Sequence, residues 1–211
     1  MKPTAVLISG NGTNLAALIH FWQQGDCNYD LKLVISNNPA VKGLDRAAAA
    51  GIETLVLDHR NYPSREEYDR AIDQALTAKG IQLIALAGFL RLLSSEFVLR
   101  WAGKMINIHP SLLPAFAGLH AHKKALQYGV KYSGCTVIFV DEGVDSGAVI
   151  DQAVVPVFEE DTEADLARRV LQEEHRIFPL ALDDLASGQV QLKEGKVVRQ
   201  TASNTDNPRP L

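Results

Sequence analysis

The chain has 211 residues, of which 46% are hydrophobic and 22% are charged, and its net charge at pH 7 is −4. A chain of this size can bury a complete sheet core, and its scattered lysines and arginines lack the basic face that a nucleic-acid partner requires. No apolar run reaches the roughly 20 residues that span a bilayer, so no membrane partner is expected either.

The first half of the chain alternates between strand and helix patterns. An apolar run over residues 4–9 leads into a glycine-rich turn and then a helical stretch over 15–24. The same order recurs in strands over 30–36, 53–57 and 81–87 and in helices over 42–50 and 64–79, the last of which begins with a capping-box pattern. This alternation predicts an α/β fold with a doubly wound, mostly parallel, Rossmann-like sheet and helices on both faces.

The second half of the chain predicts a mixed or antiparallel extension of that sheet. A strand ends near residue 109, and two more strands over 136–140 and 149–157 are joined through 141–147. A long amphipathic helix over 162–186 and a small hairpin over 189–199 follow. We expect residues 1–200 to form a single domain and residues 201–211, rich in Thr, Asn and Pro, to form a loose tail.

Asn107 and His109 lie at the end of a predicted strand, and Asp145 follows in a glycine-flanked turn. Residues two apart on a strand project from the same face. An amide can donate to a developing oxyanion while an imidazole moves a proton, and a nearby carboxylate can orient the ring, a combination that suits acyl transfer. The alternative is structural, since a lone His is commonly a satisfied core residue and Asn commonly forms turns.

The turn after the first strand reads Gly10-x-Gly12-x-x-Leu15. A dinucleotide fingerprint would have a third glycine where Leu15 stands, and residues 36–38 at the end of the second strand offer no acid for a ribose hydroxyl, so NAD binding is disfavoured. The backbone amides of Gly12, Thr13 and Asn14 and the Thr13 hydroxyl could instead hold a single phosphate at the helix start. A plain strand-to-helix turn is the alternative.

Other candidate sites are weaker. The three histidines at 109, 120 and 122 and Cys135 match no metal-binding spacing, and Ser111 lacks the motif of a serine nucleophile. Arg65 and Arg91 are either surface charges or partners for an acidic substrate tail. The two cysteines, at 27 and 135, show no CxxC spacing, which favours a reduced cytoplasm over a disulfide framework.

Over about residues 4–190 the chain resembles the folate-dependent phosphoribosylglycinamide formyltransferase family. The Asn-x-His-Pro-Ser-Leu-Leu-Pro run at 107–114, followed by an Asp, marks the wider formyltransferase group, and the Gly-Asn-Gly-Thr-Asn turn narrows it to this member. The matching segments are residues 8–15, 86–91, 107–114, 141–147 and 172–175.

The resemblance implies transfer of a formyl group from the co-substrate 10-formyltetrahydrofolate to the amine of N1-(5-phosphoribosyl)glycinamide in de novo purine biosynthesis. It implies small-molecule partners, no metal and a cytoplasmic location, and a homodimer is compatible with it. It assigns catalysis to Asn107, His109 and Asp145. It assigns the nucleotide to Gly12, Thr13, Asn14 and Glu174, and the folate to Arg65, Leu90, Arg91, Leu92, Leu93, Asn107, Asp141, Glu142, Gly143, Val144 and Asp145.

Two departures from the family pattern concern pocket detail: Leu90 stands where Met is common, and residues 115–118 are a looser version of a Lys-x-Pro-Gly segment. The alternative functions are formyltetrahydrofolate hydrolysis, formylation of another amine such as methionyl-tRNA or a sugar nucleotide, and a non-catalytic nucleotide sensor. Relatives with the first two activities usually carry an extra domain, for which we expect no room in this chain.

Overall fold

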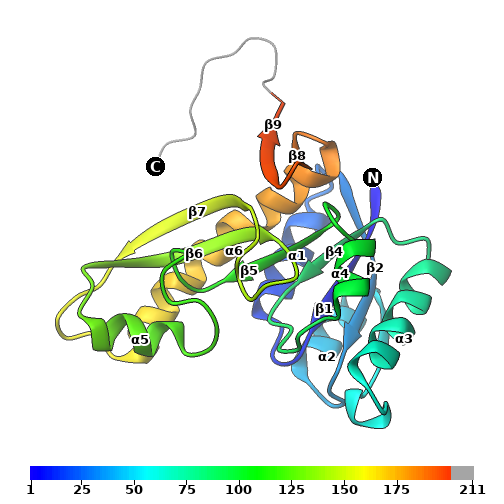
Figure 1. The fold of residues 1–211 in the computed structure, drawn as a ribbon, viewed down its shortest axis with the longest axis horizontal. Coiled ribbons are helices and arrows are strands. Elements are labelled where there is room, and N and C mark those ends of the chain that lie inside the picture. The colour runs from blue at the N-terminus through cyan, green and yellow to red at the C-terminus, as the bar shows by residue number, and fades with distance from the viewer. Residues whose placement is uncertain (201–211) are drawn as a thin grey trace.

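A seven-stranded sheet in the order β3-β2-β1-β4-β5-β6-β7 runs through the protein (Figure 1). The computed structural model describes residues 1–200, so the tail expected over 201–211 lies outside the described residues. The five strands from β3 to β5 pair in parallel, and β6 and β7 extend the sheet by antiparallel pairing. Their bounds are β1 Lys2–Ile8, β2 Tyr29–Ser36, β3 Glu53–Val56, β4 Leu83–Leu86, β5 Met105–His109, β6 Tyr132–Phe139 and β7 Val149–Pro156. The predicted doubly wound fold with an antiparallel extension is therefore confirmed.

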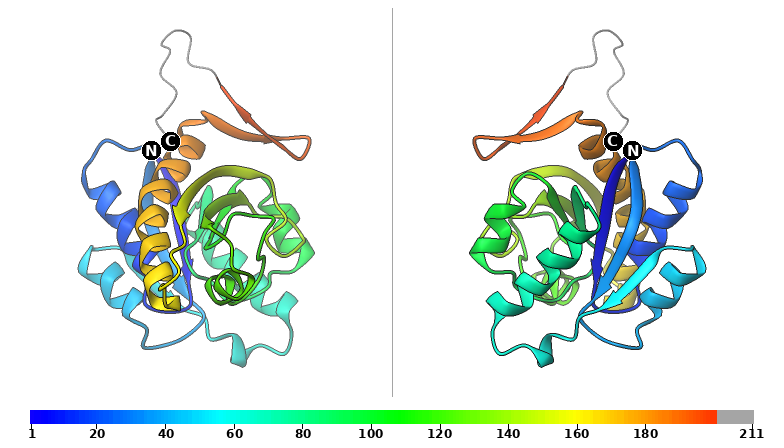
Figure 2. Two further views of the ribbon diagram at one scale, coloured as in Figure 1. Left: turned by 90° about the vertical axis from the view of Figure 1, so that its left-hand side faces the viewer. Right: turned by 90° about the vertical axis from the view of Figure 1, so that its right-hand side faces the viewer.

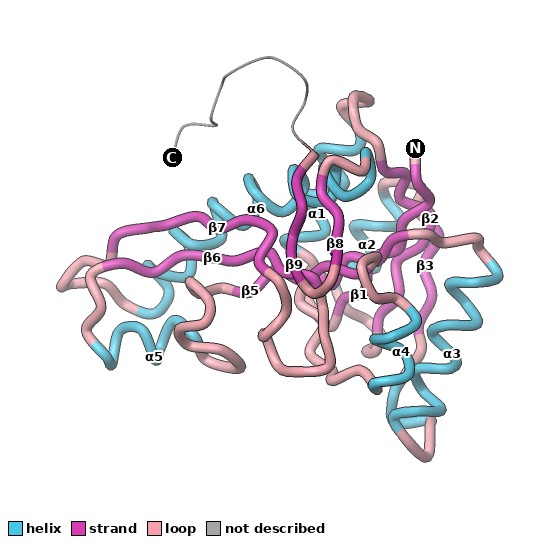
Figure 3. The backbone as a smooth tube through the Cα atoms, turned by 45° about the horizontal axis from the view of Figure 1, so that its top comes forward, coloured by secondary structure: helices cyan, strands magenta, loops and turns pink. Residues whose placement is uncertain are grey.

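Helices cover both faces of the sheet, as the alternating pattern predicts (Figure 2). Their bounds are α1 Thr13–Gln23, α2 Lys42–Ala49, α3 Arg65–Ala78, α4 Ser95–Arg100, α5 Ala121–Tyr128 and α6 Glu163–Ser187, with a short 3₁₀ helix, η1, at His59–Asn61. A separate hairpin of β8 Val190–Lys193 and β9 Lys196–Arg199 follows α6 (Figure 3). No helix within residues 1–200 has the length and apolarity needed to cross a bilayer.

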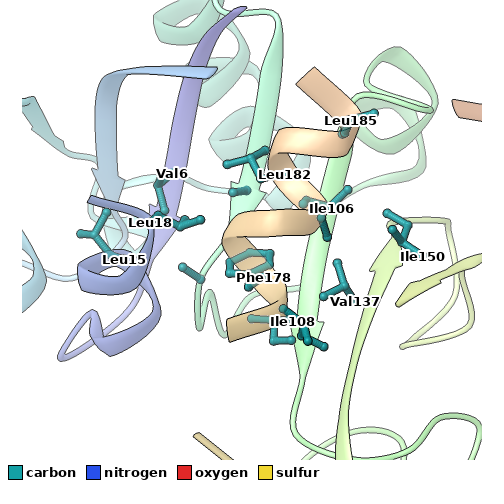
Figure 4. Close-up of a cluster of buried hydrophobic side chains, with 14 of the residues drawn as sticks. Val6, Leu15, Leu18, Ile106, Ile108, Val137, Ile150, Phe178, Leu182 and Leu185 are labelled. Carbon is teal, nitrogen blue, oxygen red and sulfur yellow. The ribbon is translucent and has the colours of Figure 1, made fainter. Parts of the chain in front are cut away.

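Two hydrophobic clusters, one on each face, hold the layers together. On one face α1 and α6 pack on the sheet, with Phe178 and Leu182 of α6 against Ile106 of β5 (Figure 4). On the other face α3 and α4 pack on the same strands through residues such as Ile72 and Phe97. Alternate residues of each central strand supply the two clusters, because side chains point to opposite faces of a strand in turn.

Polar caps fix where several helices begin. Ser64 accepts a hydrogen bond from the Glu67 amide at the start of α3, as the sequence predicts. Thr162 and Asp165 form a reciprocal capping box at the start of the 25-residue α6. Ser94 caps α4, a six-residue helix that the sequence pattern does not predict because it is too short to display a period.

The carboxyl ends of β1 and β4 meet at one edge of the sheet, where a doubly wound fold binds ligands. The turn after β1 is tied to the turn after β4 by two hydrogen bonds, from the Ser9 amide to the Gly88 carbonyl (3.1 Å) and from the Leu90 amide to the Ser9 hydroxyl (2.8 Å). The end of β5 lies beside them in the sheet. This edge therefore collects the segments that the sequence singles out.

Candidate active site

Asn107, His109 and Asp145 converge at the carboxyl edge of the sheet. His109 Nδ1 lies 3.1 Å from Asp145 Oδ2, and Asn107 Nδ2 lies 3.5 Å from Asp145 Oδ1. The side chains of His109 and Asp145 are only 7% and 13% exposed. The structure thus brings together, from positions 38 residues apart, the three side chains that the sequence singles out.

The alternation of β5 explains the placement of the amide and the imidazole. Ile106 and Ile108 point into the cluster beneath α6, so Asn107 and His109 project from the opposite face. Asp145 reaches them from the turn between β6 and β7, where its φ of 51° is left-handed. Such a φ is uncommon for a residue other than glycine but is tolerated by Asp and Asn.

Two backbone groups complete the surroundings of His109 and Asp145. His109 Nε2 lies 3.2 Å from the carbonyl oxygen of Phe116, and the Gly118 amide donates to Asp145 Oδ2 at 2.8 Å. Both ring nitrogens of His109 therefore face oxygen acceptors. An imidazole nitrogen that carries a proton can donate to the oxygen it faces, so the ring is held in place from both sides.

Asn107 keeps donor capacity for another group. Its contact with Asp145 is at the long limit for a hydrogen bond, and a second proton on Nδ2 has no protein acceptor within residues 1–200. Asn107 is half-buried at the end of a strand whose backbone is fixed on both sides by β4 and β6. It can therefore present an amide proton to a substrate oxygen with little rearrangement.

The turn over residues 141–147 is closed by its own side chains. Asp141 accepts hydrogen bonds from the Gly143 amide (3.1 Å) and the Ser146 hydroxyl (2.8 Å). A side chain at Gly147 would collide with the Phe139 carbonyl, so this glycine permits the close crossing that returns the chain to β7. These contacts hold Asp145 in place.

The predicted phosphate loop lies at the start of α1. Gly12 is the N-cap residue with a left-handed φ of 67°, and Thr13 and Asn14 are the first two residues of the helix. No side chain caps this helix, and its first turn contains no acid. The free amides and the positive end of α1 are thus available to an anion.

Glu174 meets this loop from the middle of α6. Asn14 Nδ2 donates to Glu174 Oε2 at 2.7 Å, and Glu174 is only 6% exposed. Burial raises the pKa of Glu174, although the hydrogen bond from Asn14 counteracts that rise. The side-chain oxygen of Asn14, Oδ1, is buried without a partner among the residues described, which leaves an acceptor beside the carboxyl group.

The residues expected to hold the folate lie at the same edge but make few contacts with one another. Leu90 and Leu92 are 70% and 57% exposed, an unusual state for two leucines in one turn, while Leu93 packs on the α3 and α4 cluster. Arg65 begins α3, and neither it nor Arg91 has an ion-pair partner within residues 1–200. The remaining predicted contacts, Asp141, Glu142, Gly143 and Val144, are exposed in the closed turn.

Sequence reasoning missed the backbone groups that contact His109 and Asp145. Phe116 O and Gly118 N belong to a segment that was treated as pocket detail, and backbone atoms carry no signature of residue type. Gly118, with a φ of 76°, was the available signal for a special turn. The pairing of Asn14 with Glu174, 160 residues apart, was also missed, although each residue was assigned to the nucleotide.

No three His, Cys, Asp or Glu side chains within residues 1–200 are grouped so that they could hold a metal ion. His120 is the left-handed N-cap of α5, and His122, two residues on, is partly buried, which lowers its pKa. Burial raises the pKa of the Cys135 thiol beyond its ordinary range.

Comparisons with known proteins agree on one family. Residues 2–182 match the family model described as Formyl transferase. The trifunctional purine biosynthetic protein adenosine-3 of Homo sapiens is 53% identical over 194 residues, which are 92% of this chain and 19% of that protein. The phosphoribosylglycinamide formyltransferase of Escherichia coli (strain K12) is 43% identical over 189 residues, covering 90% of this chain and 89% of the relative.

A solved structure agrees in fold. The crystal structure of glycinamide ribonucleotide transformylase 1 from Symbiobacterium toebii superposes with a TM-score of 0.92 at 45% identity and covers 94% of each chain. The chain spans about a fifth of the length of the trifunctional relatives and nearly all of the bacterial ones.

Proposed function

The chain belongs to the formyl transferase family, and from that premise we propose that it transfers the formyl group of 10-formyltetrahydrofolate to the amine of N1-(5-phosphoribosyl)glycinamide in purine biosynthesis. The observation that carries the proposal is the convergence of Asn107, His109 and Asp145 at the ligand-binding edge of the sheet. An amide donor, an imidazole between two acceptors and a buried carboxylate suit attack of an amine on a formyl carbon.

In the proposed reaction the substrate amine attacks the formyl carbon and a C–N bond forms. The carbonyl oxygen becomes an oxyanion, to which Asn107 Nδ2 donates. The bond from the formyl carbon to folate N10 then breaks, and the proton lost by the amine is delivered to that nitrogen. His109 supports the oxyanion as an imidazolium and carries the proton, while Asp145 holds the ring and its charge.

The nucleotide is assigned to the start of α1, where the middle of α6 lies against it. Gly12, Thr13 and Asn14 present backbone amides to the phosphate, and Glu174 faces the sugar hydroxyls beside Asn14. The folate is assigned to the turn after β4 and the turn over residues 141–147. There the exposed Leu90 and Leu92 would cover its rings, and Arg65 and Arg91 would meet its carboxylates.

Holding both substrates at one edge accounts for a large share of the rate. Positioning two reactants in line can contribute roughly 7–11 kcal/mol to lowering a bimolecular barrier.

We place the reaction in the cytoplasm, because both cysteines, Cys27 and Cys135, are buried free thiols, as expected in a reducing compartment.

An assay with the purified chain tests this function against its alternatives. We expect formyl transfer from 10-formyltetrahydrofolate to glycinamide ribonucleotide. The loss of formyl-folate absorbance measures its rate, and mass spectrometry identifies the formylated product. Formate release without the amine would identify a hydrolase. Turnover with methionyl-tRNA or a sugar nucleotide alone would identify another acceptor, and nucleotide binding without turnover would identify a sensor.

A further inference from the structure

The turn after β4, residues 88–94, is held by two side chains that lie outside it. Near its start the Leu90 amide donates to the Ser9 hydroxyl at 2.8 Å. At its end the Ser94 amide donates to Asp69 Oδ2 at 2.5 Å. The backbone of this turn is therefore fixed from β1 on one side and from α3 on the other.

Asp69 lies behind the turn, in the contact between α3 and α4 (Figure 1). Its side chain belongs to a residue that is only 2% exposed. The Ser94 hydroxyl also donates to this carboxyl group, while its oxygen accepts from the Phe97 amide at 3.4 Å. One carboxyl group thus fixes both the end of the turn and the start of α4.

The burial of Asp69 is unfavourable in itself. Its second oxygen, Oδ1, is buried and has no hydrogen-bond partner within residues 1–200. Burial raises the pKa of this carboxyl group, because a charge is poorly solvated there, although the bonds from Ser94 counteract the rise. An apolar side chain would avoid the cost of an unpartnered oxygen. What the carboxyl group contributes here is therefore its hold on Ser94.

We infer that Asp69 is a positioning residue for the folate, because it fixes the turn whose exposed Leu90 and Leu92 take the folate rings. The inference rests on the proposed function for the identity of that ligand and for its place on the turn. Asp69 is too deeply buried to touch the folate, so it acts only through the Ser94 backbone. Loss of its bond should weaken folate binding and leave the nucleotide, which is assigned to α1 and α6, unaffected.

Asp73 offers a matched control on the same helix. It lies one helical turn after Asp69 and contacts the other end of α4, where it accepts from Trp101 Nε1 at 3.0 Å and pairs with Arg100 at 2.9 Å. Both aspartates therefore join α3 to α4, but only Asp69 reaches the turn after β4. Substitutions at the two positions separate a loss of stability from a loss of positioning.

The test applies alanine and asparagine substitutions to both aspartates and measures steady-state kinetics and Tm. We expect Asp69→Ala to raise KM for the folate about 10-fold, the effect of one lost hydrogen bond to a charged group, with KM for the nucleotide nearly unchanged. Asp69→Asn keeps an oxygen that can accept from the Ser94 amide, so its folate KM should rise only about 3-fold. Asp73→Ala and Asp73→Asn should lower Tm but leave both KM values within about 2-fold of wild type.

Two kinetic results would overturn the inference. An unchanged folate KM in folded Asp69→Ala would show that the turn keeps its shape without Asp69. Should Asp69→Ala fail to fold, an unchanged folate KM in Asp69→Asn would decide in the same way. Equal rises in folate KM for the Asp69 and Asp73 variants would show that both only stabilise the packing of α3 on α4.

Calorimetric titration with tetrahydrofolate separates this inference from the proposed function. If the wild-type chain binds tetrahydrofolate but transfers no formyl group, the function fails. The inference then stands or falls on whether Asp69→Ala, and not Asp73→Ala, weakens that binding by about the same 10-fold. A wild-type chain that does not bind tetrahydrofolate would overturn both.

Discussion

The imidazole of His109 is held at both ring nitrogens by groups of the protein itself. Asp145 faces Nδ1 and the Phe116 carbonyl faces Nε2, and the ring itself is almost fully buried. The Nε2 proton is the one that chemistry can use, because a backbone carbonyl is a weaker acceptor than a carboxylate or an oxyanion. The residue-scale predictions therefore concern the groups that surround this ring.

Replacing Asn107 with Asp should abolish most of the activity. The substitution keeps the size of the side chain but exchanges the donor for a carboxylate, which would repel both the oxyanion and Asp145, 3.5 Å away. We expect kcat to fall on the order of 10²–10³-fold, as for loss of one oxyanion donor. Steady-state kinetics would measure this, with Asn61→Asp as a control that adds the same charge at an exposed position of η1. A kcat within a few-fold of wild type in a folded protein would assign Asn107 to structure alone.

Asp145→Asn tests the charge of the carboxylate with the backbone left undisturbed. Asn tolerates the left-handed φ of 51° and can still accept from the Gly118 amide, so the turn should keep its shape. Without the negative charge Asp145 no longer supports the positive charge that the proposed reaction places on the His109 ring, and kcat should fall about 10²–10⁴-fold. Steady-state kinetics measure kcat and the folate KM separately. A higher folate KM with unchanged kcat would make Asp145 a residue that shapes the pocket.

Glu174→Gln should stabilise the fold at high pH and weaken binding of the nucleotide. Burial raises the pKa of Glu174, so the folded protein holds this proton more tightly than the unfolded chain does. Below the ordinary pKa of about 4.3 both states are protonated and the group has no effect. As the pH rises toward the folded value, ionisation favours the unfolded chain, and stability is lost over that window.

Thermal denaturation of wild type and Glu174→Gln at pH 5 and pH 8 checks the sign. The variant should gain more in Tm at pH 8, by about 2–4 °C for each kcal/mol. Nucleotide affinity should fall in parallel, because an uncharged amide is a poorer partner for sugar hydroxyls. An equal Tm difference at the two pH values would show that burial does not destabilise the ionised form of Glu174.

At the scale of elements, the close contact between the glycine turn and α2 explains why Gly12 is a poor position at which to probe phosphate binding. A Cβ at Gly12 would come within 2.8 Å of the Gly43 Cα, and the φ of 67° is itself unfavourable for a side chain. Gly25 has a similar φ of 82°, but a Cβ there would have no atom within 4 Å. Gly25→Ala therefore measures only the cost of a side chain on a left-handed residue. Both alanine variants bear the cost of a left-handed residue, about 1–2 kcal/mol.

Gly12→Ala should therefore destabilise the protein by about 1–3 kcal/mol more than Gly25→Ala does, since the neighbouring backbone must move. Urea denaturation of the two variants measures the difference. Equal losses would mean that α2 can shift freely away from the turn.

The sequence predicts those elements whose periodicity is long enough to read. The strands beneath α6 and the whole of α6 were expected within a few residues, because buried runs and capping residues mark them directly. β6 begins at Tyr132, four residues before the expected start, and α4 was absent from the expectation. Gly134, where a side chain would strike the Ala153 backbone, obscured the first part of β6.

The sequence singles out candidate site residues where side-chain chemistry is distinctive. Asn107, His109 and Asp145 stand out by residue type and spacing, and the structure places them together. The Phe116 carbonyl and the Gly118 amide cannot, because every residue carries the same backbone groups.

At the scale of the whole molecule, the site exists only when all layers are assembled. Its groups come from the turn after β1, the end of β5, the turn before β7 and the middle of α6. Two hydrophobic clusters on opposite faces of one sheet support these segments. If residues 1–200 are one domain, the two clusters must unfold together, and activity must be lost in the same transition.

The two tryptophans allow each face to be followed separately. Trp22 of α1 packs against the cluster beneath α6, and the buried Trp101 packs in the cluster beneath α3 and α4, where its Nε1 donates to Asp73 at 3.0 Å. Trp22→Phe leaves a fluorophore on one face, and Trp101→Phe leaves one on the other. In each variant we expect the urea midpoints from fluorescence, far-UV circular dichroism and formyl transfer to coincide, because the central strands belong to both clusters. Comparing probes within one variant removes any effect of the substitution on overall stability. A fluorescence midpoint that departs from the circular dichroism midpoint in either variant would show that the corresponding layer unfolds on its own, and the single-domain assignment would then be wrong.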